Sequence, residues 1–256
     1  MTNLLPGQHR SAIKPMVVAA LTAISVVLAA GAATPVGAYP TSRTYEVTIT
    51  NLTSGQPLTP PVVATHNGGF HVFRVGQPAS FGVKEVAENG NLGPLLQALG
   101  GEGKVSHSLA TSSGPLVPDG LPGSGAGDPS VTFEIAAGPG ARFISFQSML
   151  ICTNDGFTGL DRLRLPNRVE APRSVYTDGY DAGTEVNTED FANMVPPCQS
   201  LVGVTSDDAG TGTSDPALAE GGVIRHHPNV QGVADLVPAV HGWTDPVARI
   251  TITRIA

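Results

Sequence analysis

The chain has 256 residues and a formal net charge of −7 at neutral pH, and 14% of its residues are charged. An acidic chain without a basic stripe is not expected to bind nucleic acid. Its 31 glycines, 22 prolines and 5% aromatic content favour short strands joined by many turns over a helical fold. We therefore predict an all-β protein.

The first element in the chain is an apolar segment, 16–33, which follows Arg10 and Lys14 and ends in small residues before Tyr39. This order is typical of a secretory signal peptide. An uncleaved membrane anchor is the alternative, because the apolar run approaches the length that spans a bilayer. We interpret residues 1–38 as a signal peptide, whose removal would change the net charge from −7 to −9. The mature protein is then secreted, and no second apolar segment is long enough to span a membrane.

Five runs rich in β-branched and aromatic residues are predicted to be strands. The clearest is the first, in which alternate residues share one face: Tyr45, Val47, Ile49 and Asn51. The last run mirrors it, and a chain that begins and ends on half-buried strands usually pairs them in one sheet. The five runs are 43–52, 70–75, 131–135, 143–151 and 247–255.

One short helix is predicted at 93–99, because Pro94 lies in its first turn and Gly100 follows its end. Residues 111–130 are rich in Pro, Gly and Ser and are predicted to be a loop. We find no internal repeat. The prediction is therefore one antiparallel β-sandwich domain over 43–256, with one short helix and long Gly/Pro-rich loops. We expect the protein to be a monomer.

The chain has two cysteines, Cys152 and Cys198. An exported protein meets an oxidising environment, so a disulfide between them is expected. Closing a loop of roughly 46 residues would stabilise the fold by about 4 kcal/mol. Two free thiols are the alternative, and neither cysteine has a catalytic neighbourhood.

Two acidic turns are predicted beyond the fourth strand. The first, 152–161, contains Asn154-Asp155-Gly156, and the second, 180–185, contains Asp181. Two carboxylate-bearing turns at the same end of a sheet suit a hard cation that prefers oxygen ligands, such as Ca²⁺. The alternative is that both aspartates only stabilise their own turns.

These same stretches resemble the spondin N-terminal domain family, including its form in bacterial secreted single-domain proteins. The resemblance extends from about Thr44 to Pro197, and the pattern closes with a strand like Trp243 to Arg249. One departure is Gly156, which stands near the place where animal members carry a tryptophan. The stretches that carry the resemblance are Phe133-Glu134-Ile135, 143–157, Gly159 to Leu163 and Tyr180-Asp181-Ala182-Gly183-Thr184-Glu185.

The resemblance implies a β-sandwich with a Ca²⁺ at one end, held by Asp155, Asp181 and the main-chain carbonyl of Leu150. Further oxygen atoms would come from Asn154, Asp161 or Glu185. It also implies a secreted, non-enzymatic protein that presents its loops to an extracellular protein or glycan surface in adhesion or recognition.

A small secreted zinc metalloenzyme is the alternative from another functional class, because His226, His227 and His241 lie near Asp235 in the sequence. They lack an HExxH spacing and lie on predicted loops, so packing or surface histidines are the simpler interpretation. The chain has no G-x-S-x-G elbow, and its Gly-rich segments lack the lysine of a phosphate loop. We therefore expect no enzymatic activity.

Overall fold

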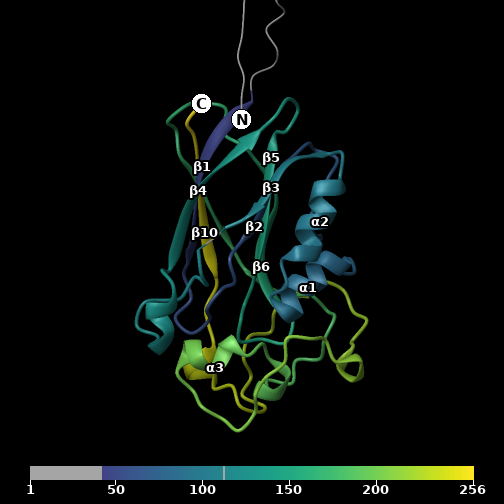
Figure 1. The fold of residues 1–256 in the computed structure, drawn as a ribbon, viewed down its shortest axis with the longest axis vertical. Helices are drawn as coiled ribbons and strands as arrows, with labels where there is room; N and C mark the ends of the chain where they lie inside the picture. The colour runs from purple at the N-terminus through teal and green to yellow at the C-terminus, as the bar shows by residue number, and fades with distance from the viewer. Residues whose placement is uncertain (1–41, 112) are drawn as a thin grey trace, which may run out of the picture. The chain divides into compact units, whose positions relative to one another are not determined.

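The computed structural model describes residues 42–111 and 113–256, so the expected signal peptide, 1–38, lies outside the described residues. Two antiparallel sheets form the described part of the chain (Figure 1). The four-stranded sheet has the order β4-β1-β10-β7, with β1 (Arg43–Asn51), β4 (Ser130–Ala137), β7 (Arg173–Thr177) and β10 (Ala248–Arg254). The six-stranded sheet has the order β3-β2-β5-β6-β8-β9, with β2 (Val62–His66), β3 (Val105–Ala110), β5 (Phe143–Met149), β6 (Gly156–Arg164), β8 (Gly179–Asp181) and β9 (Arg225–His226). The prediction of an all-β sandwich is confirmed.

The first and last strands pair as predicted. β1 and β10 are antiparallel neighbours, in register from Tyr45↔Arg254 to Asn51↔Ala248. Tyr45, Val47 and Ile49 are fully buried, which confirms the face chosen from their alternation. Their side chains meet those of the six-stranded sheet in one continuous core.

The predicted strand at 70–75 is wrong, since this segment has no regular structure and the strand of this region is β2. β2 is buried throughout because it lies between β3 and β5. In 70–75 the amide of Val72 donates to Asp161 Oδ1 at 2.9 Å, and the Phe73 ring packs on Phe157 at 5.1 Å. The segment 70–75 thus packs its aromatic side chain on the sheet and does not form backbone hydrogen bonds as one of its strands.

The first acidic turn is shorter than predicted, because β6 already begins at Gly156. Phe157 and Thr158 are buried and pair with Met149 and Ser148 of β5. The turn is therefore limited to 150–155, and most of the predicted loop is a central strand between β5 and β8.

The predicted helix is confirmed as α2 (Gly93–Gly101), but a second helix, α1 (Phe81–Asn89), precedes it. The Ser80 side chain accepts from the Val83 amide, and Gly90 ends α1 at φ +60°. α1 contacts β5 and β6, and α2 contacts β2 and β3, so both helices cover the six-stranded sheet (Figure 1). The remaining helical segments are short: α3 (Pro197–Val202), α4 (Pro238–His241) and three 3₁₀ turns at Pro122–Ala126, Phe191–Asn193 and Pro216–Leu218. No helix in the described residues has the length and apolar character to cross a membrane.

The predicted disulfide is confirmed. Cys152 and Cys198 are bonded, with their Cα atoms 5.1 Å apart, and both side chains are fully buried. The bond joins the turn after β5 to α3, across a sequence separation of 46 residues.

Because this bond closes a long loop, Cys198→Ser should lower the free energy of unfolding by about 2–5 kcal/mol. Denaturant titrations of oxidised wild type and of the variant would measure the difference. Wild type in a reductant strong enough to open the bond should approach the variant. The same midpoint for both proteins under oxidising conditions would contradict the expectation.

Candidate metal centre

The turn between β5 and β6 fixes Asp155 at the start of β6. The Thr153 hydroxyl donates to the Leu150 carbonyl at 2.7 Å and accepts from the Gly156 amide at 2.8 Å. A Cβ atom at Gly156 would lie 2.4 Å from that hydroxyl oxygen, so the turn requires glycine there. Asp155 is consequently held in one position by local backbone geometry.

The carboxylate of Asp155 is fully buried, and its two oxygen atoms differ in their bonding. Oδ2 accepts from the amides of Thr184 and Glu185 at 2.7 and 3.1 Å, and from the Thr184 hydroxyl at 3.2 Å. Oδ1 has no hydrogen-bond donor among the described residues. A buried carboxylate oxygen without a donor is costly unless a proton or a cation compensates it.

Asp181 lies at the end of β8, where its neighbour in the ladder is Gly156. Its Oδ1 accepts from the Gly183 amide at 2.7 Å. Its Oδ2 accepts from Asn187 at 2.8 Å and from Arg225 at 3.0 Å. Asp155, in the turn that precedes β6, and Asp181, at the end of the neighbouring β8, thus lie at the same end of the sheet, but Arg225 already pairs with the second carboxylate.

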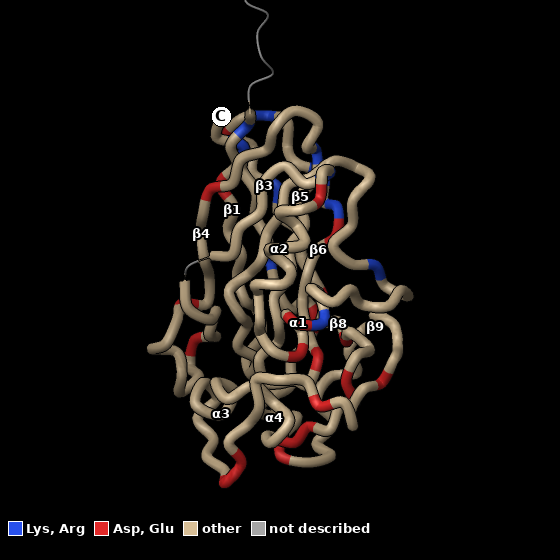
Figure 2. The backbone as a smooth tube through the Cα atoms, turned by 45° about the vertical axis from the view of Figure 1, so that its right-hand side comes forward, with Lys and Arg blue, Asp and Glu red and all other residues tan. Residues whose placement is uncertain are grey.

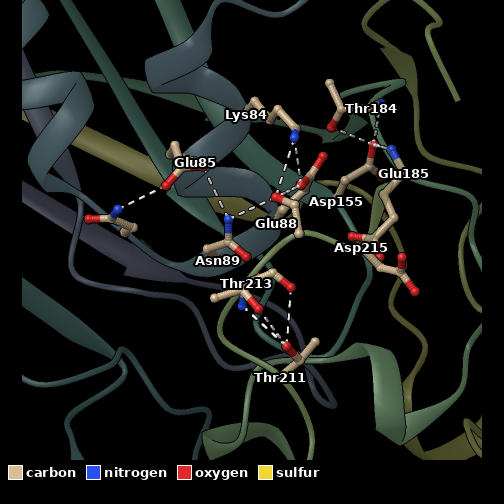
Figure 3. A network of polar contacts seen from close by, with 12 residues as sticks. Lys84, Glu85, Glu88, Asn89, Asp155, Thr184, Glu185, Thr211, Thr213 and Asp215 are labelled. Carbon is tan, nitrogen blue, oxygen red and sulfur yellow. Dashed lines mark hydrogen bonds and ion pairs between the residues drawn. The ribbon is translucent and has the colours of Figure 1, made fainter. Parts of the chain in front are cut away.

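Two further carboxylates complete the cluster, as Figure 3 shows for Glu88, Asp155 and Glu185. Glu185 is 4% exposed, and its own backbone amide donates to Asp155. Glu88 comes from α1, and its Oε1 has no hydrogen-bond donor among the described residues. Its Oε2 accepts from Ser214 and lies 3.3 Å from Lys84 Nζ. The sequence prediction missed Glu88, because α1 itself was not predicted.

Burial makes the carboxyl groups of Asp155 and Glu185 hard to ionise. It raises the pKa of Asp155 to about 7, and the charge of Asp181 adds to the effect while the Thr184 and Glu185 amides oppose it. It also raises the pKa of Glu185 to about 8, with further contributions from Glu88 and Asp155. The physical cause is the same for both groups, since each must lose its hydration close to other negative charges.

The structure places the three other predicted calcium ligands, Leu150, Asn154 and Asp161, at different distances from the cluster. The Leu150 carbonyl lies in the same turn as Asp155 and accepts the Thr153 hydroxyl. Asn154 is committed to the neighbouring loop, where its side chain contacts Thr188 and the amide of Glu189. Asp161 lies farther along β6 and accepts from His71 and Val72, so it is no part of the cluster.

The carboxylates around Asp155 are of the chemical type that calcium prefers, but among the described residues their ligand atoms do not all lie within 4.8 Å of one another. Asp155, Glu185 and Glu88 offer hard oxygen atoms, and two of these atoms, Asp155 Oδ1 and Glu88 Oε1, are buried with no donor from residues 42–111 and 113–256. Lys84 is the cation that reaches Glu88, and it compensates only part of the charge. Figure 2 shows that acidic residues gather in the lower half of the view, around α1, β8 and α4, whereas most basic residues lie in the upper half.

The histidines of the zinc hypothesis do not converge in the described residues. Their rings pack separately: His226 on Tyr180 at 5.3 Å, His227 on Trp243 at 5.1 Å and His241 on Phe191 at 6.2 Å. Asp235 accepts from the Phe191 amide and belongs to a group of three carboxylates that contains no histidine. That group (Asp190, Asp208 and Asp235) is half-buried to exposed, as is common for acidic residues without an ion.

Fold and cluster together define a disulfide-linked β-sandwich with a buried carboxylate centre at one end. The family model Spondin_N matches residues 51–204, which is more than half of the chain. The chain therefore belongs to the spondin N-terminal domain family.

Two relatives agree with this assignment. Human (Homo sapiens) Spondin-2 is 26% identical over 201 residues, covering 75% of this chain and 51% of that protein. Rat (Rattus norvegicus) Spondin-2 is 30% identical over 125 residues, covering 48% of this chain and 36% of that protein. The match thus spans about half the length of the human relative and less of the rat one.

The raised pKa values of the buried carboxyls predict a pH dependence of stability. Asp155 has a folded pKa near 7 against an ordinary value of 3.8, so the folded state holds its proton more tightly than the unfolded state. Its contribution is therefore fully present below about pH 4 and is lost as pH rises through 7. In chelator, the stability of wild type relative to Asp155→Asn should fall over this window by up to about 1.4 kcal/mol per pH unit.

Chemical denaturation at closely spaced pH values would measure this difference. Comparison with Asp155→Asn cancels the groups that do not interact with Asp155, such as the buried histidines. Glu185 interacts with Asp155, so the measured difference also contains the change in the pKa of Glu185. A difference that stays flat or rises between pH 4 and 8 would contradict the environment described for Asp155.

Proposed function

We propose that this protein is a secreted, non-enzymatic recognition domain whose loops are stabilised by one calcium ion at Asp155. Membership of the spondin N-terminal domain family supports the recognition role, and the predicted signal peptide supports export. The observation that carries the calcium proposal is the fully buried Asp155 carboxylate, one oxygen atom of which has no donor in the part of the chain that the structure describes.

Calcium suits the cluster better than magnesium does. Calcium accepts six to eight oxygen ligands in flexible geometry, whereas magnesium demands an octahedral shell and keeps its waters. Asp155 Oδ1 and the Glu185 carboxylate are the first ligands in this proposal, with Glu88 and the Leu150 carbonyl beside them. Asp181 takes part by direct ligation if Arg225 moves away, and otherwise by its charge.

The ion would fix the loops at this end of the sandwich relative to each other. Asp155 already joins the β5–β6 turn to the turn at 182–185, and Glu88 brings α1 to the same place. A loop surface made rigid in this way loses less conformational entropy on binding. We therefore assign these loops to contact with an extracellular protein or glycan surface, as in adhesion.

A hydrolase is disfavoured because, in the described residues, the Ser–His contact that also lies near an aspartate is buried. Ser145 Oγ lies 2.8 Å from His66 Nε2, and Asp161 Oδ1 is 3.5 Å from the same hydroxyl. Ser145 and His66 have no solvent exposure, and burial lowers the pKa of His66. These residues form a structural polar network that substrate cannot reach.

Thermal melts in calcium and in chelator test the proposal. Calcium at a hundredfold excess over its dissociation constant should stabilise wild type by about 2.7 kcal/mol, or raise the Tm by about 5–10 °C. Asp155→Asn and Glu185→Gln should lose most of this shift while remaining folded. Asp119→Asn, an exposed aspartate in the 111–130 loop, is the matched control and should keep it.

Magnesium should raise the Tm less, and zinc at one equivalent should not reproduce the calcium effect. Equal wild-type melting temperatures in millimolar calcium and in chelator would refute the calcium proposal.

A further inference from the structure

A hollow on the outside of the sandwich is separate from the carboxylate centre. It has a volume of about 530 Å³ and is lined by Tyr176, Asp178, Asp245 and Pro246. We call it the Tyr176 hollow. Tyr176, on edge strand β7, is 61% exposed, whereas Tyr45 on the same sheet is fully buried. A large aromatic ring is thus presented to solvent beside two carboxylates.

Both carboxylates have fixed places beside the ring. Asp178 is the single residue between β7 and β8. Asp245 reaches the same point from another part of the chain, because its Oδ1 accepts from the Gly179 amide at 3.1 Å. Neither aspartate takes part in an ion pair with any described residue. Burial raises the pKa of neighbouring Tyr180, and the negative charges of Asp178 and Asp245 raise it further.

The lining of the hollow offers acceptors and an aromatic face, with very little to donate. Asp178 and Asp245 only accept hydrogen bonds when ionised, Pro246 offers no side-chain donor, and the Tyr176 hydroxyl is the one donor. A sugar needs donors as well as acceptors around its hydroxyl groups. A basic side chain needs only acceptors, and its charge is attracted to the face of an aromatic ring.

Two arginines lie near the hollow without lining it. Arg74 lines an adjacent cavity of about 380 Å³, which shares Tyr176 and Asp178 with the hollow. Arg249 faces Tyr176 in the β7–β10 ladder. Neither forms an ion pair with the two aspartates, so both carboxylates can still accept from a ligand.

We propose that the Tyr176 hollow binds a basic side chain of a partner protein, with arginine preferred over lysine. The planar guanidinium would stack on the Tyr176 ring and donate to Asp178 and Asp245, a geometry that an ammonium group matches less well. The hollow does not use Asp155, Glu185 or Glu88, so the inference stands independently of calcium.

Nuclear magnetic resonance titration of the mature chain tests the inference with two capped tripeptides, acetyl-Gly-Arg-Gly-amide and acetyl-Gly-Gln-Gly-amide. The arginine peptide should shift the amide resonances of Tyr176, Asp178, Gly179 and Asp245, and the glutamine peptide should not. Added salt should weaken binding, because exposed charges are screened within about 8 Å at 0.15 M. The shifts should be the same in calcium and in chelator, which separates this test from that of the calcium proposal.

Variants locate the binding. Each of three substitutions should lower the affinity for the arginine peptide by about three- to tenfold: Tyr176→Ala, Asp178→Asn and Asp245→Asn. Glu134→Gln removes the same charge from an exposed position of β4, at the opposite edge of the same sheet, and should leave the affinity unchanged. Equal shifts with the glutamine peptide, an equal loss in Glu134→Gln, or displacement of the arginine peptide by a neutral trisaccharide would each overturn the inference.

Discussion

The bond from the Asp155 carboxylate to the backbone of 182–185 joins the two turns on which this end of the molecule depends. One oxygen atom accepts two amides and a hydroxyl from Thr184 and Glu185, and the other has no described donor. The first oxygen therefore specifies how the β5–β6 turn and the 182–185 turn meet. The second leaves an uncompensated acceptor inside the protein, next to Glu185 and Glu88. A cation at this point would complete an arrangement that the backbone has already formed.

Covalent and polar contacts hold the same turn from its other side. Cys152 is bonded to Cys198 of α3, and the buried side chain of Gln56 accepts from the Cys152 amide and donates to its carbonyl, both at 3.1 Å. The same Gln56 amide group donates to the His241 carbonyl at 2.7 Å, which ties in α4. The turn is thus fixed before any ion binds, so we expect calcium to stabilise this end locally and not to direct the fold.

Local patterns predicted the elements whose burial alternates, and they failed where contacts between distant residues decide the structure. β1 and β10 each have one buried face. The alternation of apolar and polar residues in both segments therefore predicted that they are strands and that they pair with each other. The segment 70–75 carries the same residue types, but the Asp161 side chain binds its backbone from a position about 90 residues away. Glu88 lies 67 positions before Asp155, and no local motif connects them. The capping residues Ser80 and Gly90 were the signal that could have revealed its helix.

The most direct test of the calcium centre is a crystal structure of the mature protein grown in millimolar calcium, with anomalous data that identify the ion. We predict one anomalous peak at about 2.3–2.6 Å from Asp155 Oδ1, with a Glu185 carboxylate oxygen also in the coordination shell. Clear density for both carboxylates with no ion between them, or with Lys84 or Arg225 bonded to Asp155 Oδ1, would contradict the account.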